Sequence, residues 1–132
     1  MHKPLIVLAA ILLGGCASTT PLDLQTNKGT RFEADIHTNV ATAYRQTVQQ
    51  ARQCFNKVNL KIEADYFPDV NQASIALSLV GNALTFAAVT VKIEPTSKGT
   101  GHMIGYYSGP GTEWIAQSFT AWANGLPGQC KV

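Results

Sequence analysis

The stretch SIALSLVGNALTFAAVTVKIEP, residues 74–95, holds two apolar segments that are separated by a turn signal. In the first segment, apolar side chains alternate with small ones at Ile75, Leu77 and Leu79. This period of two predicts a β-strand that buries one face. Gly81-Asn82 is typical of a tight turn between antiparallel strands, and Pro95 ends a longer second strand. The stretch therefore predicts a β-hairpin.

The second strand of this hairpin changes phase within its length. Its later part places three β-branched side chains on one face, at Val89, Val91 and Ile93. Leu84 and Phe86 are out of phase with these residues, so the alternation breaks between the two groups. An extra residue in one strand shifts its alternation in this way. We therefore expect a bulge or a strong twist near Ala87-Ala88.

Two further segments carry strand patterns on either side of the hairpin. In NLKIEADYF, residues 59–67, the alternating residues on one face are Leu60, Ile62, Ala64 and Tyr66. HMIGYYS, residues 102–108, is a weaker strand that follows the glycine-containing loop TSKGTG. Four consecutive strands joined by short connections favour an antiparallel meander.

Helical periodicity flanks these strands. NVATAYRQTVQQARQCFNK, residues 39–57, places apolar residues on one helical face, at Val40, Tyr44, Val48, Ala51 and Phe55. Thr38 or Asn39 can cap its start. EWIAQSFTAWAN, residues 113–124, predicts a second helix with a buried side at Trp114, Ile115, Ser118, Phe119 and Trp122. Thr112 can cap this helix, and Gly125 stands where a Schellman end requires glycine.

The order of elements is therefore α-β-β-β-β-α within a single domain over residues 37–132. We predict an α+β fold, in which an N-terminal and a C-terminal helix pack on one face of a four-stranded antiparallel meander. The other face would be solvated or used for contact, and it would carry Lys61, Glu63, Asp65, Ser74, Ser78, Thr90 and Lys92.

The N-terminal residues have a separate character. MHKPLIVLAAILLGG, residues 1–15, has a basic start and a short apolar run from Leu5 to Leu13. A helix of about nine residues rises roughly 14 Å and cannot cross a hydrocarbon core of about 30 Å. The run matches the apolar region of a secretory signal, and small residues follow it.

These residues resemble the precursors of bacterial lipoproteins, whose lipobox here is Leu13-Gly14-Gly15-Cys16. The resemblance implies that residues 1–15 are removed and that the Cys16 thiol receives a diacylglycerol. It also implies that the new N-terminus is acylated, with palmitate as the expected acyl group. Two or more acyl chains give stable anchoring. Ala17 would be the second residue of the mature protein, directly after Cys16. In the family that this segment resembles, such a residue implies transfer of the lipoprotein to the outer membrane, where it would face the periplasm. The alternatives are an ordinary signal peptide, or a core segment with a buried Cys16.

Residues 16–36 have no hydrophobic period and are polar, so we expect a lipidated N-terminus followed by a flexible tether. A flexible coil of this length would hold the domain roughly 20–30 Å from the membrane.

Two cysteines remain in addition to Cys16. Export to an oxidising compartment favours a disulfide between Cys54 and Cys130. This disulfide would close a loop of about 77 residues, and the lost entropy of the unfolded chain would then stabilise the fold by roughly 4.5 kcal/mol. Two free buried thiols are the alternative. No CxxC pair is present, and His37 and His102 lack ligand spacing, so no metal site is expected.

Composition excludes some partners. The net charge is +2, so no basic surface for nucleic acid is expected. The hydrophobic content of 45% with 14% charged residues indicates a packed core.

No catalytic constellation is evident, and no cofactor is expected. His102 lies in a glycine-rich segment without a nucleophile motif. The segment also lacks the GK[ST] of a phosphate-binding loop. Tyr106 and Tyr107 could line a sugar-binding surface with Trp114, or form the contact between the last strand and the second helix. We treat the segment around His102, Tyr106 and Tyr107 as a candidate binding loop.

Three functions fit these observations. The first is a non-enzymatic outer-membrane lipoprotein that binds an envelope protein partner. The second is a periplasmic immunity or inhibitor lipoprotein that blocks an enzyme cleft. The third is a protein that binds or hydrolyses cell-wall glycan.

Overall fold

The computed structural model describes residues 19–132. The predicted signal peptide and Cys16 lie outside the described residues. The elements follow in chain order: α1 (Pro21–Asp23), the π-helical turn η1 (Leu24–Lys28), β1 (Thr30–Ile36), α2 (Val40–Cys54), β2 (Leu60–Phe67), β3 (Gln72–Val80), β4 (Thr85–Pro95), β5 (Gly101–Tyr107), the 3₁₀ turn η2 (Pro110–Thr112) and α3 (Glu113–Ala123).

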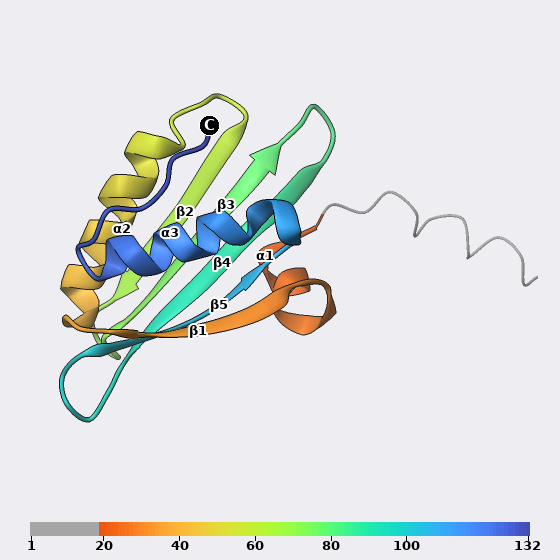
Figure 1. The fold of residues 1–132 in the computed structure, drawn as a ribbon. Helices are drawn as coiled ribbons and strands as arrows, with labels where there is room; N and C mark the ends of the chain where they lie inside the picture. The colour runs from red at the N-terminus through yellow and green to blue at the C-terminus, as the bar shows by residue number, and fades with distance from the viewer. Residues whose placement is uncertain (1–18) are drawn as a thin grey trace, which may run out of the picture.

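The strands form one five-stranded antiparallel sheet with the order β1-β5-β4-β3-β2. The α+β class is confirmed, and β2 to β5 form the expected meander (Figure 1). The prediction of four strands is wrong, because β1 adds a fifth beside β5. The residues of β1 alternate in the manner of the other strands, with Phe32, Ala34 and Ile36 more buried than Arg31, Glu33 and Asp35.

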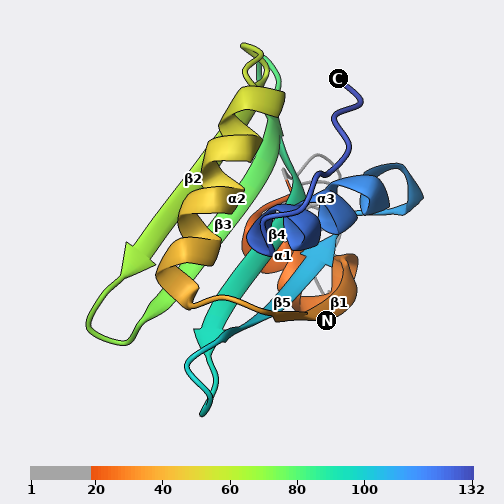
Figure 2. The same ribbon diagram turned by 60° about the vertical axis from the view of Figure 1, so that its left-hand side comes forward.

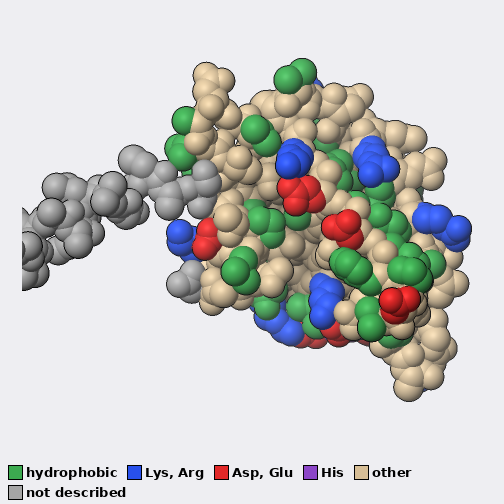
Figure 3. All heavy atoms as spheres, turned by 180° about the vertical axis from the view of Figure 1, so that it is seen from behind, with side chains coloured by type: hydrophobic (Ala, Val, Ile, Leu, Met, Phe, Trp, Pro, Cys, Tyr) green, Lys and Arg blue, Asp and Glu red, His purple; other side chains and the backbone are tan. Residues whose placement is uncertain are grey.

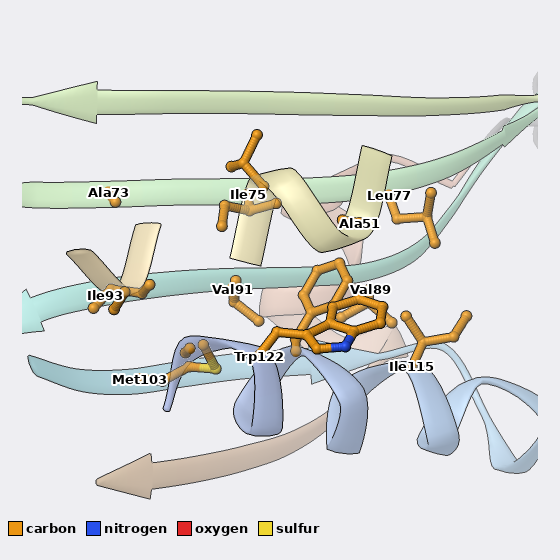
Figure 4. Close-up of a cluster of buried hydrophobic side chains, with 14 of the residues drawn as sticks. Ala51, Ala73, Ile75, Leu77, Val89, Val91, Ile93, Met103, Ile115 and Trp122 are labelled. Atoms are coloured by element: carbon orange, nitrogen blue, oxygen red, sulfur yellow. The ribbon is translucent and has the colours of Figure 1, made fainter. Parts of the chain in front are cut away.

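Helices α2 and α3 lie on one face of the sheet, which we call the inner face (Figures 1 and 2). The core lies between these layers, and Figure 4 shows side chains from α2, α3, β3, β4 and β5 converging there. Its most fully buried large residues are Phe119, Ile36, Ile75, Leu77, Ile93 and Met103. The expected bulge is present: Leu77 pairs with Val89 and Ser78 with Ala87, which leaves Ala88 as the extra residue.

The tether predicted over residues 16–36 is wrong for its described part. The Ala87 amide donates a hydrogen bond of 2.8 Å to the Thr19 carbonyl, and Thr19 forms a parallel bridge with Phe86. α1 and η1 then cover part of the outer face of β4 and β5, and Leu24 is only 1% exposed. Burial of this single leucine and the pairing of β1 with β5 fix the segment, although its composition is polar.

The ends of the two long helices follow local chemistry. The Asn39 side-chain oxygen accepts a hydrogen bond from the Thr42 amide at 2.8 Å, so Asn39 caps α2. Thr112 makes no side-chain cap on α3, because its hydroxyl donates to the Gly109 carbonyl at 3.0 Å. At the other end of α3, Gly125 has φ of 70° and the predicted Schellman bonds form.

The outer face of the sheet is mixed in character. Figure 3 shows it with hydrophobic side chains lying between scattered Lys, Arg, Asp and Glu. Three ion pairs join residues two apart on a single strand: Arg31–Glu33 on β1, Lys61–Glu63 on β2 and Lys92–Glu94 on β4. Ser78 and Thr90, which were expected on this face, are buried.

Candidate functional site: a glutamine-lined hollow beside the disulfide

The chain after Gly125 turns back and runs beside α2 toward the C-terminal end of that helix (Figure 1). Two hydrogen bonds hold it to α3: the Ser118 hydroxyl donates to the Gln129 carbonyl at 3.0 Å and accepts from the Gln129 amide at 2.9 Å. Gly128 lies so close to Trp122 that a Cβ would stand 2.5 Å from the indole nitrogen. The path of this tail is therefore fixed by packing as well as by hydrogen bonds.

The predicted disulfide is confirmed. Cys130 is bonded to Cys54, the last residue of α2, across a separation of 76 positions. Helices α2 and α3 lie side by side on the inner face. The tail that follows α3 can therefore turn back along α2 and bring Cys130 to Cys54.

A hollow of about 660 Å³ lies between α2 and this tail. One wall consists of four glutamines of α2, and the other consists of tail residues and the disulfide. Its lining residues are Gln46, Gln49, Gln50, Gln53, Cys54, Trp122, Gly125, Leu126, Pro127, Gly128 and Cys130. No charged side chain is among them, so the site is neutral.

The glutamines give the hollow its chemistry. Each carboxamide offers two donors and an acceptor, so the wall can bind groups of either kind. The side-chain oxygen of Gln46 is buried and has no hydrogen-bond partner among the described residues. A buried acceptor without a partner is costly, and a bound donor would reach this oxygen only after the Gln46 side chain turns toward the hollow. Leu126 and Pro127 add apolar surface on the other wall.

Sequence reasoning missed this site, although a signal was present. Gln46, Gln49, Gln50 and Gln53 stand at helical positions i, i+3, i+4 and i+7, which share one face. The helix predicted over residues 39–57 was inferred from its apolar face, and no role was assigned to the glutamines. The second wall depends on the path of the tail, which no local pattern of residues 125–132 indicates.

The predicted candidate His102 lies elsewhere, in strand β5, so the strand predicted over residues 102–108 is confirmed and the candidate binding segment is not a loop. On the outer face its Nε2 lies 3.1 Å from Glu33 Oε2, and its Nδ1 lies 3.3 Å from Asp35 Oδ1. The protonated imidazole can donate to both carboxylates. The arrangement is a cross-strand ionic cluster, because β1 pairs with β5 in register at these residues.

The same cluster shifts two ionisation equilibria. Arg31 contacts Glu33, and its hydrogen bond is the main cause that lowers the pKa of the Glu33 carboxyl, with His102 as the second. Hydrogen bonds to Glu33 and then to Tyr106 raise the pKa of Arg31. These shifts follow from opposite charges in contact at the protein surface.

The structure separates Tyr106 from Tyr107. Adjacent residues of a strand point to opposite faces, so Tyr106 lies on the outer face with Arg31 while Tyr107 packs on Phe32 with ring centroids 6.1 Å apart. Trp114 packs on Phe55 at 5.9 Å. These three aromatic residues therefore do not form one shared surface.

The described residues contain no other recognisable centre. Within residues 19–132, no cluster of three or more His, Cys, Asp or Glu side chains is arranged to hold a metal ion. In the same range, no helix is long and apolar enough to cross a membrane.

No model of a known protein family matches this sequence. A search of curated proteins finds no relative either.

Proposed function

We propose that this protein is a non-enzymatic lipoprotein, anchored in the outer membrane and facing the periplasm, that binds an envelope protein partner. The lipobox Leu13-Gly14-Gly15-Cys16 supports the anchor. The disulfide between Cys54 and Cys130 suits an oxidising compartment.

The observation that carries the binding function is the neutral, glutamine-lined hollow. Its partner is a segment of polypeptide that is polar but uncharged. Backbone amides and carbonyls are donors and acceptors that match the carboxamides of Gln46, Gln49, Gln50 and Gln53. Apolar side chains of the segment would meet Leu126 and Pro127, which line the facing wall.

The hollow is also built on rigid supports, which favours binding without large ordering costs. One wall is a helix, and the other is held by the disulfide and by both hydrogen bonds between Ser118 and Gln129. A charged ligand is disfavoured, because the lining offers it no opposite charge.

A site-specific photocrosslinking experiment in intact cells tests this function. A photoreactive amino acid is placed at Gln49, which lines the hollow, and in a matched control at Gln117, which is an exposed glutamine on α3 outside the hollow. We expect one protein to be crosslinked in near-stoichiometric amount from position 49 and not from position 117. A Cys16→Ser version should lose this crosslink, because the domain leaves the membrane.

Two outcomes contradict the proposal. Equal crosslinking from both positions would indicate non-specific proximity. Absence of any protein adduct, together with sedimentation of the purified domain with peptidoglycan, would assign the hollow to glycan instead. Mass spectrometry of the mature protein tests the anchor separately, since an unmodified Cys16 would remove it.

A further inference from the structure

One end of the sheet carries an unusual set of exposed apolar residues. This end, the hairpin apex, consists of residues 57–60, which lead into β2, and residues 79–86, which join β3 to β4. A hydrogen bond of 2.8 Å from the Val80 amide to the Asn59 carbonyl joins the two parts. Its apolar members with high exposure are Val58, Leu79, Val80 and Phe86.

The apolar residues of the apex are adjacent in space. Leu60, Leu79 and Phe86 occupy one row across three strands, because Leu79 pairs with both neighbours in register. Val58 is fully exposed beside this row. Exposed apolar surface that is gathered at one place marks an interaction site.

The charge of the apex is also selective. Within residues 57–60 and 79–86 the only charged residue is Lys57, and neither stretch contains Asp or Glu. Surfaces with apolar residues, a cation and no carboxylate suit the interface of a membrane with phosphate headgroups.

The start of the described chain lies at this apex. Thr19 bridges Phe86, and its carbonyl accepts the Ala87 amide. Cys16 precedes Thr19 by three residues, and three residues of chain reach at most about 11 Å. An acyl group on Cys16 would therefore hold the membrane surface close to the apex, because no long tether separates the two.

We propose that the hairpin apex rests on the lipid surface, so that Val58, Leu79, Val80 and Phe86 enter the headgroup region beside the acylated N-terminus. This inference rests on the lipid anchor of the proposed function. It fixes an orientation: the turn between β2 and β3 points away from the membrane. Strand β2 has eight residues, which corresponds to about 26 Å between its ends.

The chain offers matched control positions for a test. Val70 and Phe67 lie at the far end of β2 and are exposed by 55% and 50%. They match Val58 and Phe86, the latter exposed by 44%. Each of the four is replaced singly by cysteine in the full-length precursor. The mature protein is purified from membranes and labelled with the environment-sensitive fluorophore NBD. It is then reconstituted in vesicles of phosphatidylethanolamine and phosphatidylglycerol.

We expect a blue shift of NBD emission, and quenching by spin-labelled lipids, at positions 58 and 86 but not at 70 and 67. Val58 is a fully exposed loop residue, so Val58→Cys should not disturb the fold. The label at position 58 therefore reports on lipid contact even if Phe86→Cys destabilises the protein. Equal signals at all four positions, or none at 58 and 86, would overturn the inference. So would a blue shift at 58 and 86 that appears in native membranes without quenching by spin-labelled lipids and is absent from pure lipid vesicles, since a protein would then cover the apex.

Mass spectrometry of the same samples separates the two failures. An unmodified Cys16 contradicts the anchor of the proposed function. An acylated Cys16 with unchanged emission at positions 58 and 86 contradicts only the orientation proposed here.

Discussion

Cys130 and Cys54 have Cα atoms 5.6 Å apart, although 76 positions separate them in the chain. Their disulfide ties an otherwise exposed tail to the last residue of α2. It closes one end of the hollow that the glutamines of α2 line. The bond therefore links the stability of the domain to the shape of its candidate site.

Replacing Cys130 by Ser should lower the free energy of unfolding by about 2–4 kcal/mol, because the unfolded chain regains the entropy of an open loop. Chemical denaturation of the oxidised protein and the variant measures this difference. Reductant should lower the denaturation midpoint of the wild type to that of the variant, and it should leave the midpoint of the variant unchanged. Coincident midpoints for oxidised wild type and variant would contradict the expectation.

The same substitution, Cys130→Ser, also tests whether binding of the partner depends on the disulfide. Under conditions in which Cys130→Ser is still folded, its tail keeps the hydrogen bonds between Ser118 and Gln129 but loses its covalent end. We expect weaker crosslinking of the partner from position 49 in this variant. Full crosslinking would show that the hollow does not need the disulfide.

Local patterns predicted much of this fold. The alternation in residues 74–95 identified the central hairpin, and the break in its phase located the bulge at Ala88. Thr38 or Asn39 was expected to cap the first long helix, and Asn39 does so; Gly125 marked a helix end. These features depend on residues that are close in sequence, so their chemistry is visible without the rest of the chain.

The elements that were missed depend on distant partners. Strand β1 carries a short alternation of its own at Phe32, Ala34 and Ile36, but its pairing with β5 places Asp35 opposite His102, 67 positions away in the chain. The buried part of residues 19–29 rests on Leu24, since the other leucine of this polar stretch, Leu22, is exposed. The hollow was missed because its second wall also depends on the packing of Gly128 on Trp122 and on the hydrogen bonds between Ser118 and Gln129, which the predicted disulfide alone does not specify.

Leu24 offers a test that residues 19–29 belong to the domain. Leu24→Ala should reduce the free energy of unfolding by about 2–5 kcal/mol, which is the usual cost of removing a buried leucine side chain. Leu22→Ala is the matched control, since Leu22 is 65% exposed on the preceding turn, and it should change stability by less than about 0.5 kcal/mol. Equal effects in thermal or chemical unfolding would contradict the packing of this segment on the sheet.

Gly105 tests the contact between β5 and β1. A Cβ at this position would lie 2.4 Å from the ring of Phe32 and 2.8 Å from a methyl group of Val91. Gly105→Ala should therefore destabilise the protein by about 1–3 kcal/mol, because the neighbours must move. Gly111→Ala is the control, since no atom lies within 4 Å of its added Cβ. A neutral Gly105→Ala in calorimetry would show that the inner face has room there.

The ionic cluster on the outer face makes a prediction about pH. The pKa of Glu33 is lowered, first by the hydrogen bond from Arg31 and then by His102. Its contribution to stability is therefore present above the ordinary pKa of a glutamate, about 4.3. That contribution is lost as pH falls through the lower pKa of the folded state.

Arg31→Met should raise the pKa of Glu33 toward its ordinary value, and His102→Asn should raise it less, because the arginine is the larger cause. NMR titration of the glutamate side-chain carboxyl carbons measures both changes. Lys61→Met is the control: it removes an equivalent ion pair, to Glu63 on β2, and should leave the pKa of Glu33 in place. Since Arg31 and Glu33 are both exposed, stability at neutral pH should change little. A pKa of Glu33 that is unchanged by Arg31→Met would show that this contact does not persist in solution.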